Sequence, residues 1–129
     1  MFVFVNGCFD VLHLGHIKLL EFAYEHGNVF VGLNSDKSVK YNKGPERPFF
    51  DENYRKEMLL AIKYVYDVII FDEPTPQQLI SQLNPNIVIV GYDHSINDKC
   101  YAESIYHRKV IQAPKFGNFS TSEIINVRS

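Results

Sequence analysis

The stretch FVFVNGCFDVLHLGH, residues 2–16, decides the fold of this chain. It begins with the apolar run at residues 2–5, continues through Gly7, and reaches a helical pattern near His16. A strand that is apolar on both sides of the pleat is typical of a parallel sheet with helical crossovers. A glycine-containing loop that leads into a helix N-terminus favours phosphate binding, because unpaired N–H groups and the helix dipole attract anions.

The same alternation continues along the chain. Apolar runs of strand length recur at 29–33, 65–71 and 87–90, with a weaker one at 110–113. Helical spacing lies between them, at Ile17, Leu20, Phe22 and Tyr24, at Met58, Leu59, Ile62 and Val65, and at Leu79, Ile80 and Leu83. This order predicts one doubly wound α/β domain over residues 1–129, with a five-stranded parallel sheet.

Local signals mark the connections between these elements. Thr75 is expected to cap the third helix with Pro76 at its first helical position, and Ser120 to cap the last helix. Residues 35–52 and 92–102 are predicted to be irregular polar loops, and both follow strands. Ligands of open parallel sheets bind beyond the carboxyl ends of the strands, so these loops are the expected place for a site.

Composition narrows the function classes. The chain has 129 residues, with 13 Lys and Arg against 15 Asp and Glu and a formal net charge of -2. Such a balance argues against a nucleic-acid partner, whose phosphates would call for a basic face. No apolar run is long enough for a membrane span and no signal peptide is visible, so a cytoplasmic protein without a membrane partner is expected. Cys8 and Cys100 are expected to be free thiols.

His13 and His16 are the residues with the clearest chemistry. Beside a helix N-terminus, two imidazoles add donors that can follow developing negative charge on a phosphate. As isolated residues they also fit a metal site, but no matching Cys/His cluster follows, and no protein-ligated metal is expected. Cys8 is interpreted as a small packing residue rather than a nucleophile.

At this point the sequence resembles the cytidylyltransferase-like nucleotidyltransferases. The resemblance begins with Asn6–His16, which contains the His-x-Gly-His motif, and runs through most of the chain. It continues at residues 31–36, 43–48, Arg55, 71–76, 91–93 and 119–122. It implies a Rossmann-like fold and transfer of a nucleotidyl group from a nucleoside triphosphate to a phosphorylated small molecule, with release of pyrophosphate. It also suggests a homodimer and Mg²⁺ bound with the triphosphate.

The resemblance also implies roles for individual residues. Catalytic roles fall on His13, His16, Lys43 and Arg55, with Lys43 and Arg55 clamping the triphosphate and the acceptor phosphate. Nucleotide binding falls on Gly7, Cys8, Phe9, Asp10, Gly91, Asp93, Lys115, Ser120, Thr121 and Ser122, where Asp93 would hold ribose hydroxyls. Acceptor binding falls on Asn34, Asp36 and Arg47.

Simpler interpretations of some of these residues stand beside the functional ones. On local sequence alone, Ser120 is a helix N-cap, Lys43 and Arg55 are solvated surface charges, and Asp10 is an ordinary turn residue. A nucleotide-binding module of the same fold without turnover is the alternative from a different class, although it would not need both histidines.

Two branches of the family compete. Residues 43–48 and 71–76 are most similar to adenylyltransferases that make ADP-heptose from heptose 1-phosphate, which favours ATP. Glycerol-3-phosphate cytidylyltransferases, which use CTP, share the compact length and the Ser-Thr ending. The chain departs from the first pattern at Val90, where a lysine is usual. It departs from the second at Lys115, where an arginine is usual, and at Tyr66, where an aspartate is usual.

Overall fold

The computed structural model describes residues 1–92 and 108–116. Asp93, Cys100, Ser120, Thr121 and Ser122 lie outside the described residues. The described elements are β1 (Phe2–Gly7), α1 (Leu14–Tyr24), β2 (Asn28–Asn34), α2 (Asp36–Lys43), α3 (Glu52–Leu60), β3 (Val65–Phe71), α4 (Gln77–Leu83), β4 (Ile87–Val90) and β5 (Lys109–Gln112).

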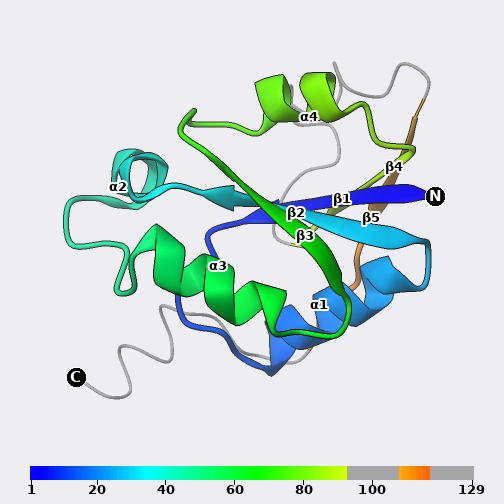
Figure 1. Ribbon diagram of the computed structural model, residues 1–129, viewed down its shortest axis with the longest axis horizontal. Coiled ribbons are helices and arrows are strands. Elements are labelled where there is room, and N and C mark those ends of the chain that lie inside the picture. Colours follow the sequence, from blue (N-terminus) through cyan, green and yellow to red (C-terminus); the bar gives the residue numbers. More distant parts are fainter. Residues whose placement is uncertain (93–107, 117–129) are drawn as a thin grey trace.

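The strands form one parallel sheet in the order β3-β2-β1-β4-β5 (Figure 1). Helices α1 and α3 cover one face of this sheet and α4 covers the other. The five-stranded, doubly wound α/β fold predicted from the sequence is confirmed. Because β1 has β2 on one side and β4 on the other, the strand order reverses at β1, and ligands of such sheets bind at this switch point.

Two apolar clusters hold the layers together. The first joins Val3, Val5 and the inner faces of β2 and β3 to Leu20 of α1 and Leu59 of α3. The second joins Phe4, Phe71 and Val90 to Leu79 and Ile80 of α4. Alternate side chains of β1 therefore enter different clusters, as expected for a strand covered on both faces.

The segment 35–52 is not irregular throughout, as the sequence had predicted, because it contains α2. Ser35 caps this helix by accepting a hydrogen bond from the Ser38 N–H at 3.1 Å, and Gly44 ends it with φ of 101°. The helix is polar and buries only Ser38 and Val39, so it shows little apolar periodicity. Its sequence signals were the capping serine and the terminal glycine.

Two other boundaries differ from the prediction. Helix α3 ends at Leu60, so Ile62 and Val65 do not belong to it, and Val65 begins β3 instead. Pro76, rather than Thr75, is the N-cap of α4, and no side chain caps this helix. Boundary residues depend on tertiary contacts that a capping pattern does not contain.

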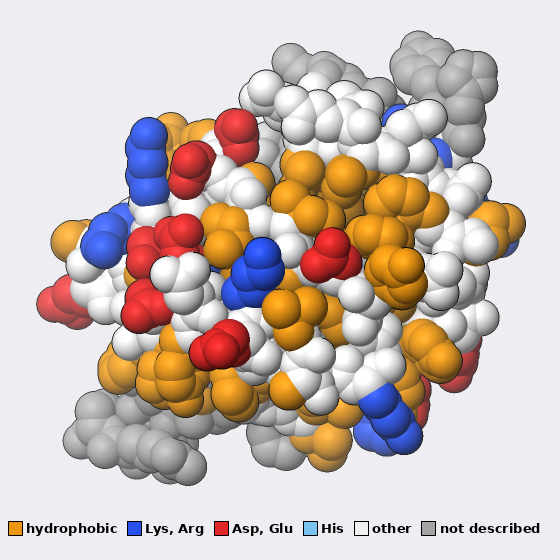
Figure 2. All heavy atoms as spheres, in the orientation of Figure 1, with side chains coloured by type: hydrophobic (Ala, Val, Ile, Leu, Met, Phe, Trp, Pro, Cys, Tyr) orange, Lys and Arg blue, Asp and Glu red, His pale blue; other side chains and the backbone are white. Residues whose placement is uncertain are grey.

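The face that carries β3 shows hydrophobic side chains gathered over its middle and right (Figure 2). Tyr66, where the cytidylyltransferase branch has an aspartate, is 65% exposed. The β2–β3 register shifts so that Val29 pairs with Val65 and Phe30 with Asp67, which makes Tyr66 the extra residue of a bulge.

Within residues 1–92 and 108–116, no helix is long and apolar enough to span a membrane.

Candidate active site

The loop from β1 to α1 places two histidines at a helix N-terminus. His13 is the N-cap of α1, and its main-chain N–H donates to Nδ1 of His16 at 3.3 Å. The two rings stack with centroids 3.8 Å apart and an interplanar angle of 21°. The helix start predicted near these residues is confirmed, and the pair lies where the dipole and the free N–H groups of α1 favour an anion.

Gly15 makes room for this arrangement. A Cβ at Gly15 would lie 2.9 Å from Cε1 of His13 and 3.4 Å from the carbonyl oxygen of Phe116. The glycine of the His-x-Gly-His motif therefore lets the His13 ring lie against the first turn of α1. It also lets the segment after β5 approach that turn.

Burial and neighbouring positive charge act together on His16. Burial, followed by the charges of His13 and Lys43, lowers the pKa of His16 to about 3. His16 is therefore neutral at physiological pH. Lys43, the last residue of α2, therefore acts electrostatically on His16 at the start of α1.

Cys8 lies in the same electrostatic environment. Burial raises the pKa of its thiol, against the opposing effects of Lys43, Arg55 and Arg47. A neutral, half-buried thiol is a poor nucleophile, which agrees with a packing role. Cys8 forms no disulfide with another described residue.

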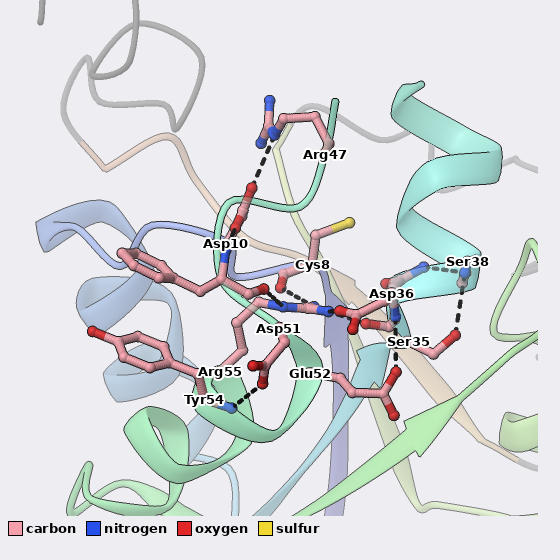
Figure 3. A network of polar contacts seen from close by, with 12 residues as sticks. Cys8, Asp10, Ser35, Asp36, Ser38, Arg47, Asp51, Glu52, Tyr54 and Arg55 are labelled. Carbon is pink, nitrogen blue, oxygen red and sulfur yellow. Dashed lines mark hydrogen bonds and ion pairs between the residues drawn. The ribbon is translucent and has the colours of Figure 1, made fainter. Parts of the chain in front are cut away.

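Asp10 holds a second chain segment against the β1–α1 loop (Figure 3). Its carboxylate is 2% exposed and accepts hydrogen bonds from Arg47 Nε at 2.9 Å, Phe49 N at 2.8 Å and Phe50 N at 3.1 Å. The family resemblance had implied that Asp10 binds the nucleotide, whereas here its carboxylate accepts hydrogen bonds from these three groups of the protein. In this structure Asp10 fixes the position of residues 47–50.

Arg55 is equally buried and equally occupied. It is 1% exposed, and its guanidinium donates to the carbonyl oxygens of Phe50 at 2.8 Å, Cys8 at 2.9 Å and Asn34 at 2.7 Å. A fourth bond, of 2.8 Å, reaches Asp36 Oδ1 (Figure 3). Arg55 therefore ties together the ends of β1 and β2, the start of α2 and the segment before α3. The sequence resemblance had implied that Arg55 clamps a phosphate, whereas in this structure four of its N–H groups are engaged within the protein.

The three expected acceptor-binding residues lie in this network. Asn34 is buried and donates from Nδ2 to Ser38 Oγ at 3.0 Å, and Asp36 is paired with Arg55. Arg47 is paired with Asp10, and its Nη2 is buried without a hydrogen-bond partner. Of the three, Arg47 has a donor left for a ligand.

The ends of β4 and β5 supply the other side of the site. Gly91 and Tyr92 follow β4, and the Lys115 ammonium lies 5.4 Å from the centroid of the Tyr92 ring. Val90, where the heptose branch has a lysine, is fully buried in the cluster beneath α4. This departure therefore adds to the core on that face.

Phe50, Tyr54 and Met58 lie beside the site, and the sequence had indicated no site role for them. A pocket of about 140 Å³ opens beside Asp10 and Arg55 and is lined by Phe9, Phe50, Tyr54 and Met58, among others. Phe50 and Tyr54 stack with centroids 4.3 Å apart. These aromatic side chains match no motif, and only the packing of α3 against the β1–α1 loop brings them to the site.

A parallel α/β sheet whose first loop carries two histidines into a helix N-terminus defines a class of nucleotide-binding proteins that act on phosphate groups. The chain belongs to the cytidylyltransferase-like family, whose model matches residues 4–127. The resemblance to this family inferred from the sequence is thereby confirmed.

Individual relatives agree with the family. A bifunctional protein HldE from Campylobacter jejuni is 50% identical over 124 residues, covering 95% of this chain and 26% of the relative. Another from Hyphomonas neptunium is 42% identical over 125 residues, covering 95% and 26%. This chain thus spans about a quarter of the length of these curated relatives.

A solved structure shows the same fold. The lipopolysaccharide core biosynthesis protein from Thermoplasma volcanium superposes with a TM-score of 0.77 at 28% identity, covering 89% of this chain and 97% of that one. The likeness covers nearly the whole of both chains, so it supports the Rossmann-like arrangement described above.

Proposed function

We propose that this chain transfers a nucleoside monophosphate from a nucleoside triphosphate to a phosphorylated sugar, with ATP as donor and a heptose 1-phosphate-like acceptor. The observation that carries the proposal is the stacked His13–His16 pair at the N-terminus of α1, with the positive charge of Lys43 close by. Support for the branch comes from the HldE relatives and from residues 43–48 and 71–76.

The chemistry suits this arrangement of donors. An acceptor phosphate oxygen attacks the α-phosphorus, forming one P–O bond while the bond to the bridging oxygen of the leaving pyrophosphate breaks. Charge moves onto the pyrophosphate, so fixed donors around it lower the barrier. His13, His16 and the N–H groups of α1 are the proposed donors, with Lys43 at the triphosphate and Arg47 at the acceptor phosphate. No covalent nucleophile is needed.

Asp10 and Arg55 receive positioning roles in this proposal. Both are buried and make several hydrogen bonds inside the protein. They hold the β1–α1 loop and residues 47–50 at a fixed separation, so nucleotide and acceptor can meet in one geometry. Gly7 ends β1, and Cys8 and Phe9 begin that loop.

The remaining nucleotide contacts are proposed from the family motifs. Asp93 would bind ribose hydroxyls, and Ser120, Thr121 and Ser122 would bind phosphate, while Gly91 and Lys115 are proposed as further nucleotide contacts. The segment after β5 passes close to α1, since the Phe116 carbonyl lies near Gly15, and this supports a shared phosphate site.

Mg²⁺ would come with the triphosphate. Within the described ranges 1–92 and 108–116, no group of three or more His, Cys, Asp or Glu side chains could hold a metal ion. Asp10 and Asp36 are already paired with arginines. The ion would therefore be held by phosphate oxygens and water, and it would supply charge neutralisation on the triphosphate.

We also propose a cytoplasmic homodimer. Supporting observations are the exposed apolar side chains of Phe49, Tyr54 and Met58 beside the pocket near α3. Met58→Glu should convert a dimer to a monomer in light scattering, whereas an unchanged mass would exclude this face.

Pyrophosphate release tests the reaction. ATP and CTP are each supplied with heptose 1-phosphate and with glycerol 3-phosphate, and the His13→Ala variant serves as control. Turnover with ATP and heptose 1-phosphate is expected. Turnover confined to CTP would establish the cytidylyltransferase alternative. Nucleotide binding without turnover on a broader panel of sugar phosphates would establish the alternative of a non-catalytic nucleotide-binding module.

A further inference from the structure

The imidazole of His16 is held from several directions. The His13 N–H donates to its Nδ1 at 3.3 Å, and the His13 ring lies parallel to it at 3.8 Å. The Phe9 ring meets it edge-on, with centroids 5.0 Å apart and an interplanar angle of 62°. The ring therefore has one orientation in which all three contacts are made.

The hydrogen bond from His13 also fixes the tautomer. An imidazole nitrogen that accepts a hydrogen bond must carry a lone pair, so the proton of the neutral ring lies on Nε2. A doubly protonated ring would point Nδ1–H at the main-chain N–H. Burial and the charges of His13 and Lys43 lower the pKa of His16 to about 3, and they therefore also favour the neutral ring.

Phe9 reaches its position through an uncommon backbone conformation. Its φ is 46°, in the left-handed region that bulky residues rarely adopt. The side chain is 5% exposed, and its ring is so close to Gly7 that a Cβ there would lie 2.8 Å from Phe9 Cε2. Strained residues of this kind persist where the surrounding structure requires them, often at functional sites. Besides packing in the apolar core, the Phe9 ring in this conformation contacts His16.

We propose that His16 acts as a neutral hydrogen-bond donor through Nε2, with its tautomer fixed by the His13 main-chain N–H and its orientation fixed by Phe9 as a positioning residue. The inference rests on the proposed function, in which the acceptor of this hydrogen bond is a phosphate oxygen. It changes the role of Phe9 from nucleotide binding to support of a catalytic residue. With His16 neutral, Lys43 is a source of positive charge at this site.

Nitrogen-15 NMR of labelled histidine side chains tests the tautomer without any activity measurement. His26 is an internal reference, because its Nδ1 lies 2.9 Å from the Phe22 carbonyl oxygen and must carry a proton to donate to it. Between pH 5 and 8, His16 should show an unprotonated Nδ1 and a protonated Nε2 throughout. His26 should show a protonated Nδ1. Signals are assigned by their loss in His16→Gln and His26→Gln.

A matched pair of variants tests Phe9. Phe9→Leu should bring the second tautomer of His16 into view and lower kcat about 10- to 100-fold, with KM changed less than about twofold. Phe22→Leu removes the ring that lies 5.1 Å from His26 and should leave the His16 signals unchanged.

Two outcomes would overturn the inference. One is a protonated Nδ1 on His16 in the wild type, or titration of His16 near pH 6.5, and this measurement stands even if Phe9→Leu does not fold. The other is a folded Phe9→Leu protein with wild-type His16 signals. Absence of turnover with MgATP and heptose 1-phosphate would refute the proposed function alone, because the NMR result does not depend on it.

Discussion

Replacing Arg55 by lysine tests whether this arginine is a structural tie. The guanidinium donates to three carbonyl oxygens and to Asp36, and it is 1% exposed. A lysine keeps the charge, but its single nitrogen cannot span four acceptors spread around a planar fork. If it retains two of them, two buried acceptors lose their partners at about 1 to 2 kcal/mol each. Arg55→Lys should therefore lower the free energy of unfolding by about 2 to 4 kcal/mol.

Urea denaturation followed by circular dichroism measures this loss. With a slope of about 2 kcal/mol per molar urea, the midpoint should fall by roughly 1 to 2 M. Asp36→Asn keeps an acceptor oxygen and should cost only about 1 kcal/mol. Lys37→Met, at an exposed position of α2, should stay within about 0.5 kcal/mol of the wild type. An Arg55→Lys protein as stable as Lys37→Met would refute the structural role and return Arg55 to the phosphates.

Three further predictions concern the histidines and the lysine. His13→Ala and His16→Ala should each remain folded and lose about 100- to 1000-fold in kcat, and near wild-type pyrophosphate release in either would exclude the proposed mechanism. Lys43→Ala should lower kcat and kcat/KM together, whereas a rise in KM alone would limit Lys43 to ground-state binding. Because burial and the charges of His13 and Lys43 lower the pKa of His16 from its ordinary 6.5 to about 3 in the folded protein, acidification protonates the unfolded chain first. Stability should be unaffected above pH 6.5 and fall below it, by about 2 kcal/mol at pH 5, and His16→Gln should remove this part of the loss in urea titrations.

The sequence by itself determined the class of fold and the centre of the site. Strands that are apolar on both faces predict a covered parallel sheet, and all five expected strands are present in the structure within one or two residues. His13, Gly15 and His16 are local in sequence, so their place at the start of α1 follows from the motif. The spacing of apolar residues did not predict α2, because a short polar helix that buries only Ser38 and Val39 has little apolar periodicity.

Only the tertiary structure decided which partners the charged residues of the site contact. Asp10 and Arg47 are separated by 37 residues in the chain, and Arg55 and Cys8 by 47, yet both pairs are hydrogen-bonded. A motif records which residue types occur together but not which of them are buried. Burial depends on how α3 packs against the ends of β1 and β2. Once buried, an arginine and a carboxylate must satisfy their hydrogen bonds within the protein, and for this reason Arg55 and Asp10 hold together the chain segments around the site.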